Sequence, residues 1–229
     1  MASSLDPTTD NELLPASIPA PINMRDLLSC QVAARLFLEN GIESVRMTDV
    51  AKGAGVGVAT LYRHFSTKGR LAAGAGILIW KRFNRLIAER ASTAAYAELS
   101  GLERLASLMD YYCETYAMQP GFMRFLDEFD RLALLEGLKG EELMTAYTAE
   151  VNASYPIFKN AYELGLKDGS IAREVDFNLF FRTVSHALMG VAQKMLRGEV
   201  IQSDDFGQDA RRAELDCIAQ MARITLTTK

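Results

Sequence analysis

Hydrophobic residues recur every three or four positions from residue 23 to the end of the chain, which is the spacing of amphipathic helices. The pattern therefore predicts an all-α fold. Near the N-terminus it predicts four helices: one that ends at Asn40-Gly41, a short one that opens at Met47 or Thr48, a second short one from about Val58 to His64, and a long one from a Ser66 or Thr67 cap to about Ala91.

Gly55 lies between the two short helices, where a tight turn needs a residue that tolerates a positive φ. The order is helix, short helix, glycine turn, short helix, which is the order of a helix-turn-helix unit. In such a unit the second short helix enters the major groove of DNA. Leu61 and Phe65 are four residues apart, so we expect both to face the core of this small domain and their neighbours to face outward.

The rest of the chain is predicted to be helical as well. Ser100-Gly101-Leu102-Glu103 is a capping box, and the helix that it opens ends at Gln119-Pro120-Gly121. A hydrophobic stripe from Leu143 to Tyr162 predicts one long helix that ends near Asp168-Gly169. The two last helices are expected at about 177–196 and 208–227.

Composition favours an ordinary globular chain of 229 residues, 49% of them hydrophobic. No apolar run reaches the ~18 residues that cross a bilayer, and the N-terminus lacks a basic stretch followed by an apolar one. We therefore expect a cytoplasmic location and no membrane partner. Three widely spaced cysteines and two histidines argue against a disulfide framework, a metal site and a cofactor.

Charge divides the chain unevenly. Residues 1–22 carry a net charge of -3, residues 23–85 carry +6 and residues 86–229 carry -7. A basic module at one end of an acidic chain suggests that only this end meets a polyanion. Four of the six prolines fall in residues 1–22, which we interpret as a disordered tail. The predicted domains are residues 23–70, the helix-turn-helix domain, and residues 71–229, a larger helical domain.

The stretch AGVGVATLYRHFSTK, preceded by RMTDVA, resembles the DNA-binding domain of the TetR/AcrR family of transcriptional regulators. The shared positions are Asp49-Val50-Ala51, Ala54-Gly55-Val56, Thr60-Leu61-Tyr62, His64-Phe65 and Lys68. Three positions depart from the family pattern. Gly57 replaces a Ser or Thr cap, Arg46 replaces a threonine, and Gly69 replaces an acidic residue after the lysine.

Phosphate and base contacts are expected from this module. Tyr62, His64 and Lys68 can donate to phosphate oxygens, and the backbone N–H groups of residues 66–68 form a helix start that can bind an anion. Val58 and Ala59 can meet a thymine methyl group. The alternatives are a structural role for His64, a merely solvated Lys52, and Val58 and Ala59 as simple helix filler. The predicted DNA-binding residues are Arg46, Thr48, Lys52, Gly57, Val58, Ala59, Thr60, Tyr62, Arg63, His64 and Lys68.

The resemblance implies that the second domain holds an effector pocket and a dimer interface. Buried tyrosine hydroxyls require partners, and a ligand or water can supply them. The predicted ligand-binding residues are Tyr112, Tyr116, Phe125, Phe129, Tyr155, Phe158, Tyr162 and His186. The predicted dimer residues are Ala187, Gly190, Val191, Leu215, Ile218 and Ala222. For both sets the alternative is the core of a single chain.

The sequence therefore predicts a homodimeric, ligand-responsive transcriptional regulator. It is expected to repress by binding a palindromic operator in double-stranded DNA and to be released by a small apolar or aromatic effector. An activator and a non-specific DNA-binding protein are the alternatives. An enzyme that uses the helical pocket is disfavoured, because no phosphate loop, carboxylate pair or nucleophile with its base is present.

Overall fold

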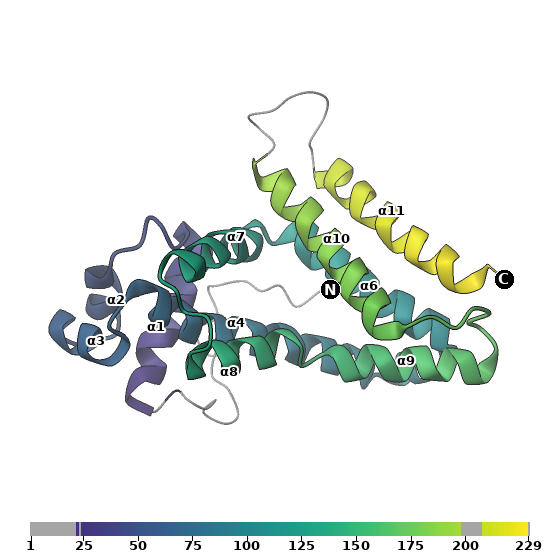
Figure 1. The fold of residues 1–229 in the computed structure, drawn as a ribbon, viewed down its shortest axis with the longest axis horizontal. Helices are drawn as coiled ribbons and strands as arrows, with labels where there is room; N and C mark the ends of the chain where they lie inside the picture. The colour runs from purple at the N-terminus through teal and green to yellow at the C-terminus, as the bar shows by residue number, and fades with distance from the viewer. Residues whose placement is uncertain (1–21, 23, 198–207, 229) are drawn as a thin grey trace. The chain divides into compact units, whose positions relative to one another are not determined.

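A computed structural model describes residues 22, 24–197 and 208–228, and every regular element in these ranges is a helix (Figure 1). The all-α fold is thereby confirmed for the described residues. The predicted tail, residues 1–22, lies outside them apart from Ile22, whose side chain is buried.

The first four helices begin and end where local signals predict. They are α1 (Met24–Asn40), α2 (Met47–Gly53), α3 (Val58–Phe65) and α4 (Lys68–Ala91). Gly41 and Gly55 have φ angles of 82° and 66°, which a residue with a side chain rarely adopts. The hydroxyl of Thr67 accepts a hydrogen bond of 3.2 Å from the backbone N–H of Arg70, so Thr67 caps α4. Helix α2 packs against both α1 and α3, as in a helix-turn-helix unit.

Seven helices follow α4 in the described residues. They are α5 (Ala94–Ala97), α6 (Gly101–Met118), α7 (Pro120–Leu135), α8 (Glu142–Val151), α9 (Tyr155–Asp168), α10 (Phe177–Arg197) and α11 (Gln208–Thr227). The capping box at the start of α6 is present, with the Ser100 hydroxyl accepting from the Glu103 N–H and the Glu103 carboxylate accepting from the Ser100 N–H. The predicted ends of α6, α10 and α11 are confirmed.

The single long helix predicted over residues 143–168 is wrong, because the chain forms α8 and α9 with a turn at residues 152–154. Pro156 is the physical reason. It lies in the first turn of α9, where a proline is tolerated, but it has no N–H to donate to the carbonyl of Asn152. A continuous helix would have required that hydrogen bond.

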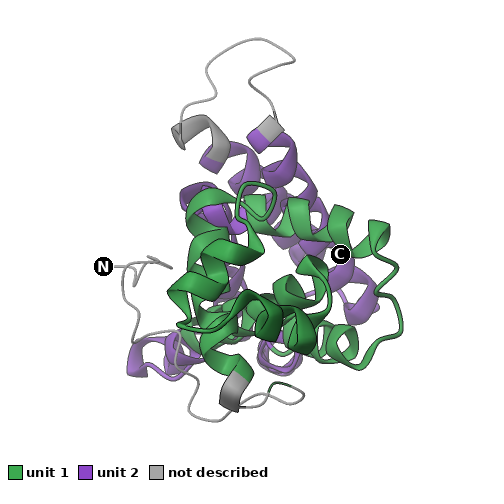
Figure 2. Ribbon diagram, turned by 90° about the vertical axis from the view of Figure 1, so that its left-hand side faces the viewer, with its two compact units in different colours: residues 1–86, 124–153 green, residues 87–123, 154–229 purple. Residues whose placement is uncertain are grey.

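The described chain packs as two compact units (Figure 2). Unit 1 contains residues up to 86 together with 124–153, and unit 2 contains residues 87–123 together with 154–229. Unit 1 thus joins the helix-turn-helix segment to α8 and to most of α7. The predicted domain boundary between residues 70 and 71 falls within α4 and within unit 1. The division of the chain into a DNA-binding domain and an effector-binding domain at this point stays a prediction.

Aromatic rings form the core of unit 1. Phe125 stacks on Phe129 with ring centroids 5.7 Å apart, and Phe129 contacts Tyr147 at 4.6 Å. The indole N–H of Trp80 donates to the hydroxyl of Tyr147 at 3.1 Å. Helices α4, α7 and α8 are therefore held together by one buried cluster.

In unit 2, helix α6 packs against α9, α10 and α11, and α10 lies beside α11 (Figure 1). Gly101 allows α6 to approach α9 closely, since a Cβ atom at residue 101 would lie 2.0 Å from the backbone nitrogen of Gly165. The carbonyl of Leu226 accepts hydrogen bonds from the N–H groups of Ala172 and Arg173, which fixes the end of α11 to the segment before α10.

Candidate DNA interface and effector site

Helix α3 has one buried face and one exposed face. Leu61 and Phe65 are 1% and 6% exposed, as their spacing predicts. Val58 and Tyr62 are 37% and 48% exposed, although both have large apolar surfaces. Arg63 is also exposed. The helix thus presents aromatic, apolar and cationic groups together, a combination suited to base edges and phosphates.

The other predicted DNA-binding residues lie around this helix. Nine of the eleven are exposed and two are half-buried. The exposed ones are Arg46, Thr48, Lys52, Gly57, Val58, Ala59, Tyr62, Arg63 and His64, and the half-buried ones are Thr60 and Lys68. These residues lie in α2, in α3, directly before each of these two helices and at the first residue of α4, and their contacts with DNA remain predictions.

Arg46 supports the start of α2. Its backbone N–H donates to the carboxylate of Asp49 at 3.0 Å, and its guanidinium pairs with the same carboxylate at 3.3 Å. The backbone hydrogen bond is the main reason why the pKa of Asp49 is lowered. The Arg46 side chain is 80% exposed, so this surface ion pair is weak and leaves the guanidinium accessible.

His64 has a partner within the chain. Its Nδ1 atom lies 2.5 Å from a carboxylate oxygen of Asp26 on α1. The contact ties the end of α3 to α1, which fits the alternative structural role of this histidine. The residue as a whole is exposed, its side chain is 23% exposed, and the contact occupies one of the two ring nitrogens.

The predicted anion-binding helix start is corrected by the structure. The N–H groups of Ser66 and Thr67 donate to the carbonyls of Tyr62 and Phe65, so neither is available to a phosphate. The Lys68 ammonium group donates to the carbonyl of Glu43 at 3.1 Å, and partial burial lowers its pKa. Lys68 thus has a structural role in addition to the predicted phosphate contact.

The predicted ligand-binding residues divide between the two units. Phe125 and Phe129 lie in unit 1, whereas the other six lie in unit 2. Tyr112 packs edge to face on Phe158 at 5.3 Å, and Tyr162 stacks on Phe177 at 4.6 Å. His186 is exposed on α10 and is not among the buried residues. Six of the eight predicted residues are buried in a single chain, as the core alternative expects, and their part in effector binding stays a prediction.

Hydroxyl partners explain the buried tyrosines. The hydroxyl of Tyr112 lies 3.0 Å from that of Ser154, and burial raises the pKa of Tyr112 to about 12. The hydroxyl of Tyr162 donates to the carbonyl of Val175 and accepts from its N–H. The chain itself therefore satisfies these hydroxyls, and neither of them requires a ligand as its partner.

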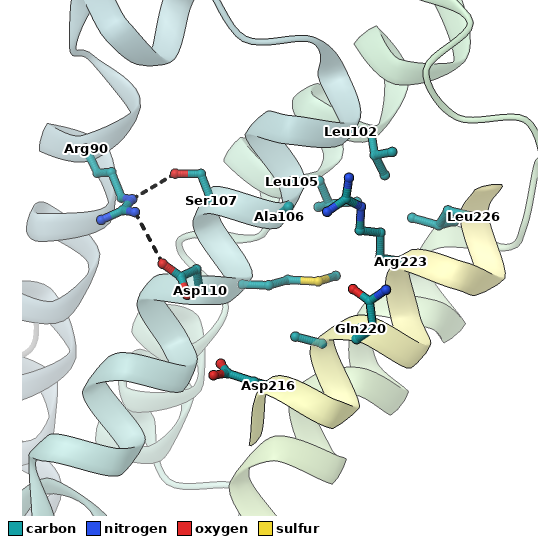
Figure 3. Close-up of a pocket in the computed structure, with 12 residues that line it drawn as sticks. Arg90, Leu102, Leu105, Ala106, Ser107, Asp110, Asp216, Gln220, Arg223 and Leu226 are labelled. Carbon is teal, nitrogen blue, oxygen red and sulfur yellow. Dashed lines mark hydrogen bonds and ion pairs between the residues drawn. The ribbon is translucent and has the colours of Figure 1, made fainter. Parts of the chain in front are cut away.

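A mixed cleft of about 380 Å³ opens in unit 2 between α6 and α11 (Figure 3). Leucine side chains and charged side chains both line it, and the side chain of Arg223 extends from α11 toward Leu105. Arg90 donates to the Ser107 hydroxyl at 2.9 Å and lies 3.7 Å from Asp110. Arg212 also pairs with Asp110. Most charges in this cleft are thus already balanced by one another.

A larger groove of about 780 Å³ lies in unit 1, along α7 and α8 and the turn between them. Seven of its lining residues are apolar or glycine and four are polar: Phe129, Ala133, Leu134, Gly140, Met144, Tyr147 and Val151, with Asp130, Lys139, Thr145 and Thr148. Of the predicted ligand-binding residues, only Phe129 lines it. Sequence reasoning missed this groove, although Gly137 and Gly140 mark the turn at its end.

The predicted dimer residues divide by exposure. Leu215 and Ala222 are 0% and 5% exposed in a single chain, so they belong to its own core. Gly190 is exposed, and Ala187, Val191 and Ile218 are half-buried. Three large apolar residues that were not predicted are half exposed on the same two helices: Leu179 (53%), Met221 (57%) and Ile224 (51%).

Within the described residues, no helix combines the length and the apolar character needed to cross a membrane, and no group of three or more potential ligands could hold a metal ion. The short α2–α3 unit with its exposed α3 face defines a helix-turn-helix DNA-binding protein. Comparison with known proteins specifies the class further.

Residues 31–75 match the family described as bacterial regulatory proteins, tetR family. The chain is 26% identical to the HTH-type transcriptional repressor KstR2 of Rhodococcus jostii over 160 residues. This alignment covers 66% of this chain and 70% of KstR2. A TetR-family regulator from Mesorhizobium loti shares the fold with a TM-score of 0.62 at 16% identity, over 86% of this chain and 94% of that one. FadR from Thermus thermophilus, solved with lauroyl-CoA, has a TM-score of 0.57 at 13% identity, over 89% of this chain and 96% of that one. Residues 31–75 thus carry the tetR-family match, and the chain over most of its length is similar to TetR-family transcriptional regulators.

Proposed function

We propose that this chain is a homodimeric repressor that binds a palindromic operator and releases it when a small apolar effector binds. The observation that carries the proposal is the exposed face of α3, where Val58, Tyr62 and Arg63 stand out from a helix fixed by Leu61 and Phe65. A helix of eight residues makes few base contacts. Two copies related by a two-fold axis would contact two half-sites ~34–36 Å apart, or a multiple of that distance.

The proposed dimer interface is formed by the exposed faces of α10 and α11. Leu179, His186 and Gly190 are exposed on one face of α10, and Met221 and Ile224 are exposed on one face of α11. A Cβ atom at Gly190 would meet nothing within 4 Å, so another helix can approach closely there. Exposed apolar faces on neighbouring helices are typical of protein interfaces.

Support for an apolar effector comes from two sources. The structurally similar repressor from Thermus thermophilus was solved with lauroyl-CoA, whose acyl chain is apolar. The groove in unit 1 has mostly apolar walls and a volume within the ~300–1,000 Å³ of ligand pockets. We propose an effector with an apolar chain or ring on this basis. An effector that binds the free protein more tightly than the operator complex must weaken operator binding by the same factor.

Selection of duplexes from a random library by the purified full chain tests this function. We expect enrichment of an inverted repeat. With that operator, Arg63→Ala should reduce the slope of log affinity against log salt by ~0.9 for each phosphate that Arg63 neutralises, or about 1.8 in a dimer. Lys159→Ala, which removes an exposed cation on α9, is the control and should leave the slope unchanged. Failure to enrich any sequence over random DNA would favour the non-specific DNA-binding protein.

A further inference from the structure

We propose that the groove along α7 and α8 binds the effector, that it takes an apolar chain ending in a negatively charged group, and that Glu136 and Glu141 transmit its occupancy to α3. This inference rests on the proposed function, because it assigns the effector site of that regulator. It is independent of the aromatic residues first predicted to bind the effector, apart from Phe129.

The walls of the groove fit an apolar chain. Phe129, Met144, Tyr147 and Val151 supply apolar surface from α7 and α8. Leu134 is 82% exposed at the end of α7, so a large apolar side chain stands at the groove with little of its surface covered. Covering this side chain removes apolar surface from water and so favours binding of an apolar chain.

Charge places the polar end of the ligand at the turn between α7 and α8. The groove has two charged side chains, Asp130 and Lys139. Asp130 lies within α7, near the buried Tyr147, whose pKa it helps to raise. Lys139 lies in the turn and is exposed. The carboxylates of the same turn, Glu136 and Glu141, do not line the groove and already accept hydrogen bonds from the start of α4. Lys139 is therefore the lining cation beside which a carboxylate or another anion of the ligand would lie.

Residues of the same turn form hydrogen bonds with the start of α4, which directly follows α3. Both carboxylate oxygens of Glu136 accept from the N–H of Gly69 at 3.1 Å, and the hydroxyl of Thr67 also donates to Glu136. Glu141 pairs with Arg70 through two hydrogen bonds of 2.9 and 3.0 Å. Only two residues separate the end of α3 from the start of α4, so a displacement of these carboxylates reaches α3 directly.

Helix α7 contacts the helix-turn-helix segment at a second place. Glu128 accepts from the N–H of Glu43 at 3.0 Å, and Arg131 pairs with the Glu43 carboxylate at 3.1 Å. Arg124 donates to the carbonyl of Glu39 at 3.1 Å. The connection between α1 and α2 is thus bound to α7, and the start of α4 is bound to the turn that follows α7.

A ligand in the groove lies between α7 and α8 and would change the spacing of these two helices. The turn at residues 136–141 joins them, so its two carboxylates move with that spacing. The helix-turn-helix segment must then follow or lose the hydrogen bonds described above. Couplings between two binding sites usually change affinity by about 5- to 150-fold. We infer an effect on operator affinity within that range.

A side chain that fills the groove tests the site without any ligand. Thr148 lines the groove on α8, whereas Ala149 is exposed on the same helix and does not line it. Thr148→Trp should weaken binding of the selected operator at least fivefold, and Ala149→Trp should change it less than twofold. Circular dichroism and sedimentation check that both variants fold and associate like the wild type. Equal operator affinity of these two variants would overturn the proposed site.

The transmission step is tested by combining variants. In a background with Glu136→Ala and Glu141→Ala, addition of Thr148→Trp should change operator affinity less than twofold, because the groove is then uncoupled from the start of α4. A fivefold effect that persists in this background would overturn the role of the two carboxylates and leave the site intact.

Dodecanoate is the probe for the chemical class. By calorimetric titration we expect it to bind the wild type, to bind Thr148→Trp at least tenfold more weakly and Lys139→Gln about fivefold more weakly. Ala106→Trp, which fills the cleft of unit 2, should bind it like the wild type. Lack of binding to the wild type overturns the anionic chain as ligand class, and loss in Ala106→Trp alone places the site in the other cleft. Neither result contradicts the proposed function. That function is contradicted only if no operator is selected from the random library.

Discussion

The substitution Tyr112→Phe tests whether Tyr112 is a core residue or an effector-binding residue. The Tyr112 and Ser154 hydroxyls are 3.0 Å apart, and the two residues are 4% and 1% exposed. Removing one hydroxyl loses a hydrogen bond of net ~0.5–1.5 kcal/mol and leaves the other buried group with a desolvation cost of ~1–3 kcal/mol. We expect the free energy of unfolding to fall by about 1–2 kcal/mol. Urea denaturation followed by circular dichroism measures it.

Ser154→Ala and the double variant complete a mutant cycle. A coupling energy of about 1 kcal/mol between the two hydroxyls is expected if the bond forms. A Tyr112→Phe protein with wild-type stability and a coupling energy near zero would refute the reasoning. Weaker effector binding without any change in stability would instead restore Tyr112 to the effector site.

Alkaline pH gives an independent measure of the burial of Tyr112. Burial raises the pKa of Tyr112 from 10.0 to about 12, so the neutral phenol is favoured in the folded chain. The corresponding stability, roughly 2.7 kcal/mol, is present in full below pH 10 and is lost as pH rises toward 12. Tyr112→Phe should therefore lose less stability than the wild type between pH 9 and pH 11.5. An identical loss in both proteins would show that Tyr112 ionises as freely in the folded chain as in the unfolded one.

Two further substitutions test unit 2. Gly101→Ala would place a Cβ atom 2.0 Å from the backbone of Gly165, and we expect a loss of roughly 1–3 kcal/mol in thermal unfolding. Gly57→Ala, whose Cβ meets only the Thr60 hydroxyl at 3.8 Å, is its control and should cost under ~1 kcal/mol. Ile224→Asp should give a folded monomer by light scattering, because it puts a charge in the proposed dimer face, whereas the exposed neighbour Thr225→Asp should stay dimeric. Dimers of the Ile224 variant would exclude this face.

Helix boundaries near the N-terminus could be predicted because the signals that set them are local. Asn40-Gly41, Gly55 and the Thr67 cap each act within four residues of the boundary that they define. The break between α8 and α9 was missed because hydrophobic spacing continues through it, from Tyr147 to Phe158. Periodicity records which side of a helix is apolar, and it does not record whether each carbonyl has a donor.

The role of the aromatic residues could not be decided from the sequence for a different reason. An aromatic stripe has the same spacing whether it lines a pocket or fills a core, and the partners of its hydroxyls decide between the two. For Tyr112 that partner lies 42 residues away, and for Tyr162 it is the backbone 13 residues away. The exposed α3 face was predictable because Leu61 and Phe65 alone fix its orientation.

Gly69 shows how a local departure can be explained only by a distant residue. The TetR pattern often has an acidic residue here, and its negative charge would interact favourably with the positive N-terminal end of the helix dipole. The first turn of α4 has no acidic residue. Glu136 supplies that carboxylate from 67 residues away by accepting the Gly69 N–H. A side chain at residue 69 would conflict with it, because its Cβ atom would lie 2.3 Å from a Glu136 oxygen. The negative charge at the N-terminal end of α4 therefore comes from Glu136, in the turn after α7. The start of α4, which directly follows α3, thus depends on the position of that turn.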